Sequence, residues 1–175
     1  MNSTQYVKKE LEKEQILLVV IPAETYHDSV LEIGRLVSKK KTCYVTLNKT
    51  CDALEEELPK NARKNVFYVD GISSSFHDVP KKRARVVHVS NPCALSEISI
   101  LITKLLKKKF TYLVFDSISN VLIYQKSAKI SQFISLLTNK VRQTKTRALI
   151  YIVDIAEQQT VLKECAMFVD KVVRL

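Results

Sequence analysis

Glycine is almost absent from this sequence. Gly34 and Gly71 are the only two among 175 residues, so tight left-handed turns must be rare or built with Asn and Asp. The loops that wrap a phosphate group in many α/β proteins need several glycines close together, because their backbone adopts positive φ angles. The sequence therefore excludes a glycine-rich phosphate loop.

The cysteines are few and widely spaced, without a C-x-x-C pair. This excludes a disulfide-stapled scaffold and favours a reducing, intracellular setting. A metal site could be drawn between His88 and Cys93, but their spacing matches no ligand pattern, so we expect no metal. The four are Cys43, Cys51, Cys93 and Cys165.

The sequence also lacks an apolar run that could cross a membrane. The run near its start covers only Ile16 to Ala23, whereas a membrane helix needs about 20 residues. It does not fit a signal peptide, since Glu10, Glu12 and Glu14 stand where positive residues are required. We therefore expect no membrane contact and a cytoplasmic location.

Two kinds of segment alternate along the chain, and 46% of its residues are hydrophobic, enough for a core. Short β-branched and aromatic runs predict strands, and apolar residues at helical spacing lie between most of them. This alternation predicts a three-layer α/β fold with a mostly parallel central sheet. The expected strands are Gln15–Ile21, Thr42–Leu47, Asn65–Asp70, Arg85–Ser90, Thr111–Asp116, Arg147–Asp154 and Phe168–Leu175.

Three apolar stripes mark the expected helices. They comprise Val30, Ile33, Gly34 and Val37; Ile98, Ile102 and Leu105; and Ile130, Phe133, Ile134, Leu137 and Val141. We expect residues 15–175 to form one domain, preceded at residues 1–14 by an arm or a short docked helix. The segment Ile72–Ala84 combines serines, a proline and basic residues without periodicity, which predicts an exposed, mobile loop.

Five segments, in their order along the chain, resemble the RecA-like ATPases of the KaiC-like type. They are NVFYVDGIS (Asn65–Ser73), VVHVSNPCALSEISILI (Val86–Ile102), YLVFDSISNVLIY (Tyr112–Tyr124), ISQFISLLTNKVRQTKTRALIYIV (Ile130–Val153) and FVDKVVRL (Phe168–Leu175). The likeness runs from about Gln15 to the end. It implies a RecA-like fold in which the first strand leads into a phosphate loop and the strand ending at Asp116 lies near it.

The phosphate-loop motif of that family does not carry over. Laying G-x-x-x-x-G-K-[ST] after the first strand places Ile21 and Tyr26 at the glycines. His27 then stands at the lysine and Asp28 at the hydroxyl residue, so the permanent positive charge is lost. We therefore interpret this position as an ordinary helix start, with Thr25 or Asp28 as its cap.

The segment Thr111–Ser119 ends a buried strand on Asp116, as in a Walker B motif, whose carboxylate helps to hold Mg²⁺. The resemblance also implies a catalytic carboxylate after the second strand, but that strand ends Leu47-Asn-Lys49. We expect Asp116 and Ser117 to cap the following helix instead. The chain is therefore predicted to be a non-hydrolysing pseudo-ATPase without a cofactor. A weaker alternative keeps nucleotide binding without hydrolysis, at His27, Asp28, Asp116 and Ser117.

The formal net charge of +10 bears on partners, because anionic surfaces attract such a chain. Lysines that end helices complement the helix dipole, and in a parallel fold they should gather at the strands' N-terminal edge. Nucleic acid is thus an alternative partner. Its candidate contacts are Phe76, Lys81, Lys82, Arg83, Arg85, Lys107, Lys108 and Lys109. The leading hypothesis remains a regulatory or scaffolding protein that acts through protein contacts or self-association.

Overall fold

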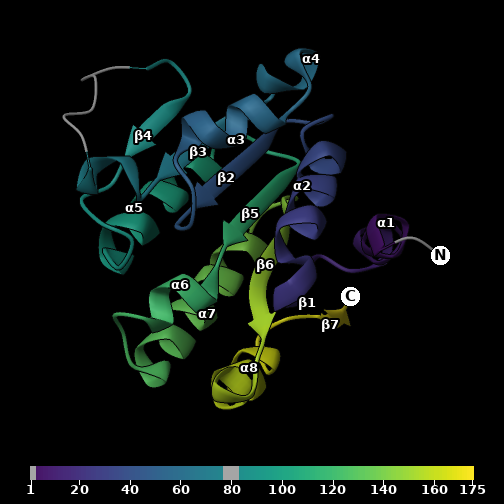
Figure 1. Ribbon diagram of the computed structural model, residues 1–175, viewed down its shortest axis with the longest axis vertical. Coiled ribbons are helices and arrows are strands. Elements are labelled where there is room, and N and C mark those ends of the chain that lie inside the picture. Colours follow the sequence, from purple (N-terminus) through teal and green to yellow (C-terminus); the bar gives the residue numbers. More distant parts are fainter. Residues whose placement is uncertain (1–2, 77–82) are drawn as a thin grey trace.

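A seven-stranded parallel sheet forms the centre of the molecule (Figure 1). In this computed structural model, which describes residues 3–76 and 83–175, the strand order is β4-β3-β2-β5-β6-β1-β7. Every neighbouring pair runs parallel, as the alternation of strands and helices predicted. The strands are β1 (Ile16–Pro22), β2 (Thr42–Thr46), β3 (Val66–Asp70), β4 (Val86–His88), β5 (Tyr112–Asp116), β6 (Arg147–Asp154) and β7 (Lys171–Arg174).

Helices cover both faces of this sheet, which makes the three-layer α/β architecture (Figure 1). On one face, α1 (Ser3–Lys13), α2 (Tyr26–Val37) and α3 (Cys51–Glu57) bury their apolar residues. On the other lie α5 (Leu95–Leu106), α6 (Ile118–Leu122), α7 (Ser127–Arg142) and α8 (Gln159–Ala166). The short α4 (Lys60–Arg63) precedes β3.

The strands are apolar on both faces because each face meets helices. In β1, Leu17, Val19 and Ile21 face the α1–α3 side, whereas Ile16, Leu18 and Val20 face the α5–α8 side. The stripe predicted along α7 is buried throughout, from Ile130 to Val141. None of the helices in the described part of the chain is long and apolar enough to cross a membrane.

Helix α1 docks against the sheet through Val7 and Leu11. An ion pair of 2.6 Å between the Lys171 ammonium and the Glu10 carboxylate ties it to β7, and the Thr4 hydroxyl donates to Glu32 of α2. Residues Ser3–Lys13 therefore form a helix that packs on the domain.

The segment between β3 and β4 is partly ordered by its neighbours. Ser73–Ser75 forms a 3-10 turn in which Ser73 is buried, whereas Ser75 and Phe76 are exposed, as the sequence predicted for this loop. The Arg83 guanidinium pairs with Asp52 and Glu55 of α3, which anchors the far end of the segment. Residues 77–82 lie outside the described part of the chain, so the predicted mobility there stays a prediction.

Candidate functional site

The crevice lies where β1, β2 and β5 end and α2 begins. Strand β1 ends at Pro22, a 3-10 turn covers Ala23–Thr25, and α2 starts at Tyr26. On the other side of β6 from β1, Asp116 at the end of β5 lies opposite Thr46 of β2. The first-strand turn and the aspartate of the Walker B-like segment are thus brought together, as their positions in the sequence indicated.

Two tyrosine hydroxyls satisfy the Asp116 carboxylate. The Tyr26 hydroxyl donates to Oδ1 at 2.5 Å, and the Tyr44 hydroxyl donates to Oδ2 at 2.9 Å. Asp116 is only 1% exposed, and Tyr44 only 4%. A buried carboxylate without partners would be strongly destabilising, so these donors are what make burial of Asp116 tolerable. The predicted role of Asp116 as a helix cap was wrong, because its oxygens point to α2 and β2.

Local geometry explains why these residues meet. Side chains alternate along a strand, so Asp116 points to the same face as Val114, which packs on the α1–α3 side. Tyr44 belongs to the same apolar cluster and lies one strand away. Tyr26 begins α2, which covers this face and brings its hydroxyl over the strand ends.

Burial dominates the electrostatics of this cluster. Desolvation raises the pKa of Asp116 above its usual range, although the hydrogen bonds from Tyr26 and Tyr44 act in the opposite direction. The pKa of each tyrosine is raised as well, first by burial and then by the neighbouring Asp116 charge. Both tyrosines therefore stay protonated donors at neutral pH.

A cavity of about 50 Å³ adjoins the cluster, lined among others by Tyr26, His27, Lys49, Glu57 and Asp116. Ligand sites for small molecules are typically ~300–1,000 Å³, so this space is too small for a nucleotide. The Lys49 ammonium lies 2.7 Å from a Glu57 oxygen and 2.9 Å from His27 Nδ1. The positive charge of Lys49 is therefore neutralised within the crevice.

The residues do not fit a magnesium-bound nucleotide. Both oxygens of Asp116 accept tyrosine hydroxyls, and the Lys49 ammonium is paired with Glu57. Within residues 3–76 and 83–175, no group of three or more acidic, histidine or cysteine side chains is arranged to hold a metal ion.

The four crevice residues singled out in the sequence do not all lie in one site in the structure. His27 and Asp116 line the same cavity, with the His27 side chain 58% exposed. Asp28 is exposed in the first turn of α2, while Ser117 is fully buried and donates to Asn120 Oδ1 at 2.6 Å. Ser117 occupies the N-cap position of α6 but makes no capping hydrogen bond to the backbone, and Thr25 likewise does not cap α2 through its side chain.

Sequence reasoning missed Tyr44, Lys49 and Glu57. Tyr44 sits inside a strand and looks like any core aromatic, and only its alignment with β5 reveals its partner. The sequence held one weak signal for Tyr44: it lies two residues before Thr46 in the same strand, which puts both side chains on one face of the sheet. Glu57 lies eight residues after Lys49 and reaches it only because α3 folds back over the strand end.

A second buried carboxylate, that of Asp70, lies at the C-terminal end of β3, next to β2. Asp70 at the end of β3 accepts hydrogen bonds from the backbone N–H groups of Cys51, Ile72 and Ser73 and from the Ser73 hydroxyl. Burial alone would raise the pKa of Asp70, but these donors hold it below its usual value. Asp70 therefore organises the turn after β3.

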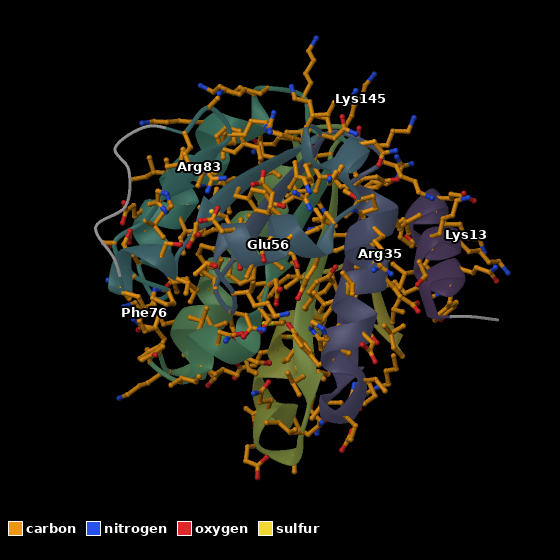
Figure 2. All side chains as sticks on the ribbon, turned by 45° about the horizontal axis from the view of Figure 1, so that its top comes forward. Lys13, Arg35, Glu56, Phe76, Arg83 and Lys145 are labelled. Atoms are coloured by element: carbon orange, nitrogen blue, oxygen red, sulfur yellow. The ribbon has the colours of Figure 1, made fainter. Side chains whose placement is uncertain are left out.

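The basic candidates occupy different surroundings. Arg83 is held by Asp52 and Glu55, whereas Arg85 is exposed, and Lys81 and Lys82 lie outside the described residues. Lys107, Lys108 and Lys109 are exposed after α5. Phe76 is 69% exposed and lies at the side of the molecule in Figure 2, on the same flank as Arg83.

Solved structures of other proteins share this architecture. The chain superposes on a KaiC-like protein, PH0186, from the hyperthermophilic archaeon Pyrococcus horikoshii OT3 with a TM-score of 0.53 and 15% sequence identity. The match covers 79% of this chain and 61% of that one. A RadB recombinase matches with a TM-score of 0.53 and 17% identity, over 86% of this chain and 70% of the other.

The chain has a RecA/KaiC-like fold. The resemblance drawn from the five sequence segments is confirmed at this level. No family model matches the sequence, and no curated protein matches it either. At these identities the likeness establishes the architecture alone.

Proposed function

We propose that this protein is a RecA/KaiC-like domain that has exchanged nucleotide chemistry for a structural role and acts through contacts with other proteins. One observation carries the proposal: the Tyr26 hydroxyl lies 2.5 Å from Asp116 Oδ1, so the tyrosine at the phosphate-loop position occupies the carboxylate that a magnesium ion would need. Lys49, paired with Glu57, offers no free charge to a phosphate.

Exposed apolar side chains support a role in protein contacts. Ile123 and Tyr124, adjacent in the turn after α6, are 70% and 61% exposed. Together they offer adjacent apolar area that a protein partner could bury. Self-association, or pairing with an active relative of the same fold, is the mode that the architecture suggests.

The test of lost chemistry is a thermal-shift and hydrolysis assay with ATP and Mg²⁺. We expect no change in Tm and no phosphate release, because a ligand stabilises a fold only where it binds the folded state. The Asp116→Ala variant serves as the control. Hydrolysis by the wild type that disappears in Asp116→Ala would refute the proposal, and a rise in Tm of a few degrees would favour retained nucleotide binding.

The contact role is tested by light scattering on the purified chain and by capture of relatives with the same fold. The double variant Ile123→Ser/Tyr124→Ser should reduce any association. Met167→Ser is a matched control, since Met167 is also an exposed apolar residue, 74% accessible, but follows α8. Equal loss in both variants would show that exposed apolar side chains in general, and not those of the α6 turn, govern association.

A further inference from the structure

The edge of the sheet where the strands begin is strongly basic. Turns that precede four adjacent strands, β3, β2, β5 and β6, carry eight exposed lysines. In Figure 2, where this edge comes forward, long side chains with nitrogen tips fan out around Lys145. The basic edge consists of Lys39, Lys40, Lys41, Lys64, Lys107, Lys108, Lys109 and Lys145.

These charges are not neutralised by the protein. Among the described residues, the ion pairs involve other cations, such as Arg142 with Asp170 and Lys171 with Glu10 beside this edge, and none involves a lysine of the basic edge. Exposed cations near one another repel, so the arrangement is unfavourable unless an anion joins it. Each of these lysines follows the end of a helix, so helix dipoles and the parallel topology explain where they lie. The remaining unpaired positive charge is what an anion would neutralise.

Two of the lysines are held in place by aromatic rings. The Lys41 ammonium lies 5.0 Å from the centre of the Phe110 ring and donates to the Lys108 carbonyl at 2.5 Å. The Lys108 ammonium lies 5.3 Å from the centre of the Phe67 ring. Such contacts fix the positions of otherwise flexible charges and reduce the entropy lost when an anion binds.

The spacing of the charges suits a linear polyanion. Neighbouring strands are about 4.8 Å apart, so the four strands spread the basic edge over about 15 Å. A compact anion would touch only part of such a row. A chain of phosphates can follow its whole length.

A hollow opens within the basic edge between the end of α5 and the turn from α7 to β6. Its volume is about 550 Å³, and Lys109, Phe110, Gln143 and Lys145 are among the residues that line it. Sites for small organic groups fall in the range ~300–1,000 Å³. The hollow combines two cations with an exposed amide that can donate and accept hydrogen bonds, a set that suits a nucleotide unit.

We propose that the basic edge binds single-stranded nucleic acid, with phosphates along the lysines and a nucleotide unit in the hollow. A single strand is favoured because its bases are free to enter a hollow, whereas duplex bases face inwards. This site lies at the opposite edge of the sheet from the Asp116 crevice. The inference goes beyond the proposed function and does not depend on whether that crevice is closed.

The experiment measures binding of a fluorescein-labelled 20-nucleotide single strand over a series of salt concentrations. The test variant is Lys107→Gln/Lys109→Gln/Lys145→Gln, which spares Lys41 and Lys108 and so leaves their ring contacts intact. The control variant Lys126→Gln/Lys129→Gln/Lys163→Gln removes the same charge from exposed lysines near the start of α7 and on α8. Each lost phosphate contact lowers the log–log salt slope by about 0.7 for single strands.

We expect the test variant to lose about 2 from that slope and about 100-fold in affinity at ~0.1 M salt, with the control near wild type. Amide signals of residues 107–111 and 143–146 should shift when the oligonucleotide is added to the wild type. Equal loss in both variants, absence of binding, or shifts confined to the crevice would overturn the inference. So would binding of polyglutamate or anionic phosphatidylserine vesicles as tight as that of the oligonucleotide, because either result would reveal an unspecific anion surface.

Discussion

Replacing Tyr44 by phenylalanine removes one hydroxyl that donates to the buried Asp116 carboxylate and changes nothing else in shape. The hydrogen bond is 2.9 Å long, and both residues are almost completely buried. Hydrogen bonds to charged groups contribute about 1.5–3 kcal/mol, and loss of the donor leaves a desolvated oxygen. We expect Tyr44→Phe to lower the free energy of unfolding by about 2 kcal/mol near neutral pH.

Tyr68 provides a matched control on the neighbouring strand. Its ring lies 6.1 Å from that of Tyr44, it is fully buried, and within the described residues its hydroxyl has no hydrogen-bond partner. Tyr68→Phe removes an unsatisfied polar atom, so it should leave stability unchanged or raise it. Urea unfolding followed by circular dichroism measures both variants.

A double-mutant cycle with Asp116→Asn separates the charge from the hydroxyl. In the Asp116→Asn background the hydrogen bond becomes a neutral one, and Tyr44→Phe should then lower stability by only about 1 kcal/mol. Two results would refute the reasoning: equal effects of Tyr44→Phe and Tyr68→Phe, or an effect of Tyr44→Phe that is the same with and without Asp116.

Further predictions concern glycine, pH and thiol reactivity. Gly34→Ala should raise the free energy of unfolding by up to ~1 kcal/mol, because a Cβ there meets only a side chain at 3.7 Å. Gly71→Ala should lower the free energy of unfolding by about 1–3 kcal/mol, because a Cβ there would lie 2.7 Å from a buried leucine side chain. Chemical denaturation measures both variants. The lowered pKa of Asp70 stabilises the fold above its unfolded value near 3.8, so the advantage of wild type over Asp70→Asn should shrink as pH falls through that region, measured by acid titration of unfolding. Asp116 has the opposite pH dependence, because its raised pKa means that its contribution to stability is complete below pH 3.8 and is lost as pH rises. The stability of Asp116→Asn relative to wild type should therefore increase toward neutral pH. A difference in stability that does not change with pH would contradict this. With a thiol reagent at about pH 8, the partly exposed Cys93 should react first, because burial raises the pKa of the other thiols to about 12; equal rates would argue against the described packing of Cys43, Cys51 and Cys165.

Much of the fold could be predicted because hydrophobic periodicity reports which faces are buried. The doubly apolar strand Ile16–Pro22 and the stripe from Ile130 to Val141 required a sheet covered by helices, and both are found. Strand ends were less accurate: Phe168–Leu175 was expected, but only Lys171–Arg174 pairs, because Asp170 turns back to accept hydrogen bonds from the N–H groups at the start of β1. Local composition does not encode such a long-range contact.

By itself, the sequence determined that a glycine-rich phosphate loop is excluded. The chain has only two glycines, and its second strand ends in Leu47-Asn-Lys49, and both facts hold in any conformation. The sequence also determined that positive charge would collect at one edge, since helix ends and strand starts share an edge in every parallel α/β fold.

Only the tertiary structure decided which side chains meet around Asp116. Residues 26, 44 and 116 are far apart in the chain, and their hydroxyl and carboxylate groups meet because α2 lies over a sheet in which β5 pairs with β2. In the same way, folding places Lys109 and Lys145 around one hollow while Arg83 is drawn into ion pairs. Residue types state which interactions are available, and the packing of distant segments decides which of them form.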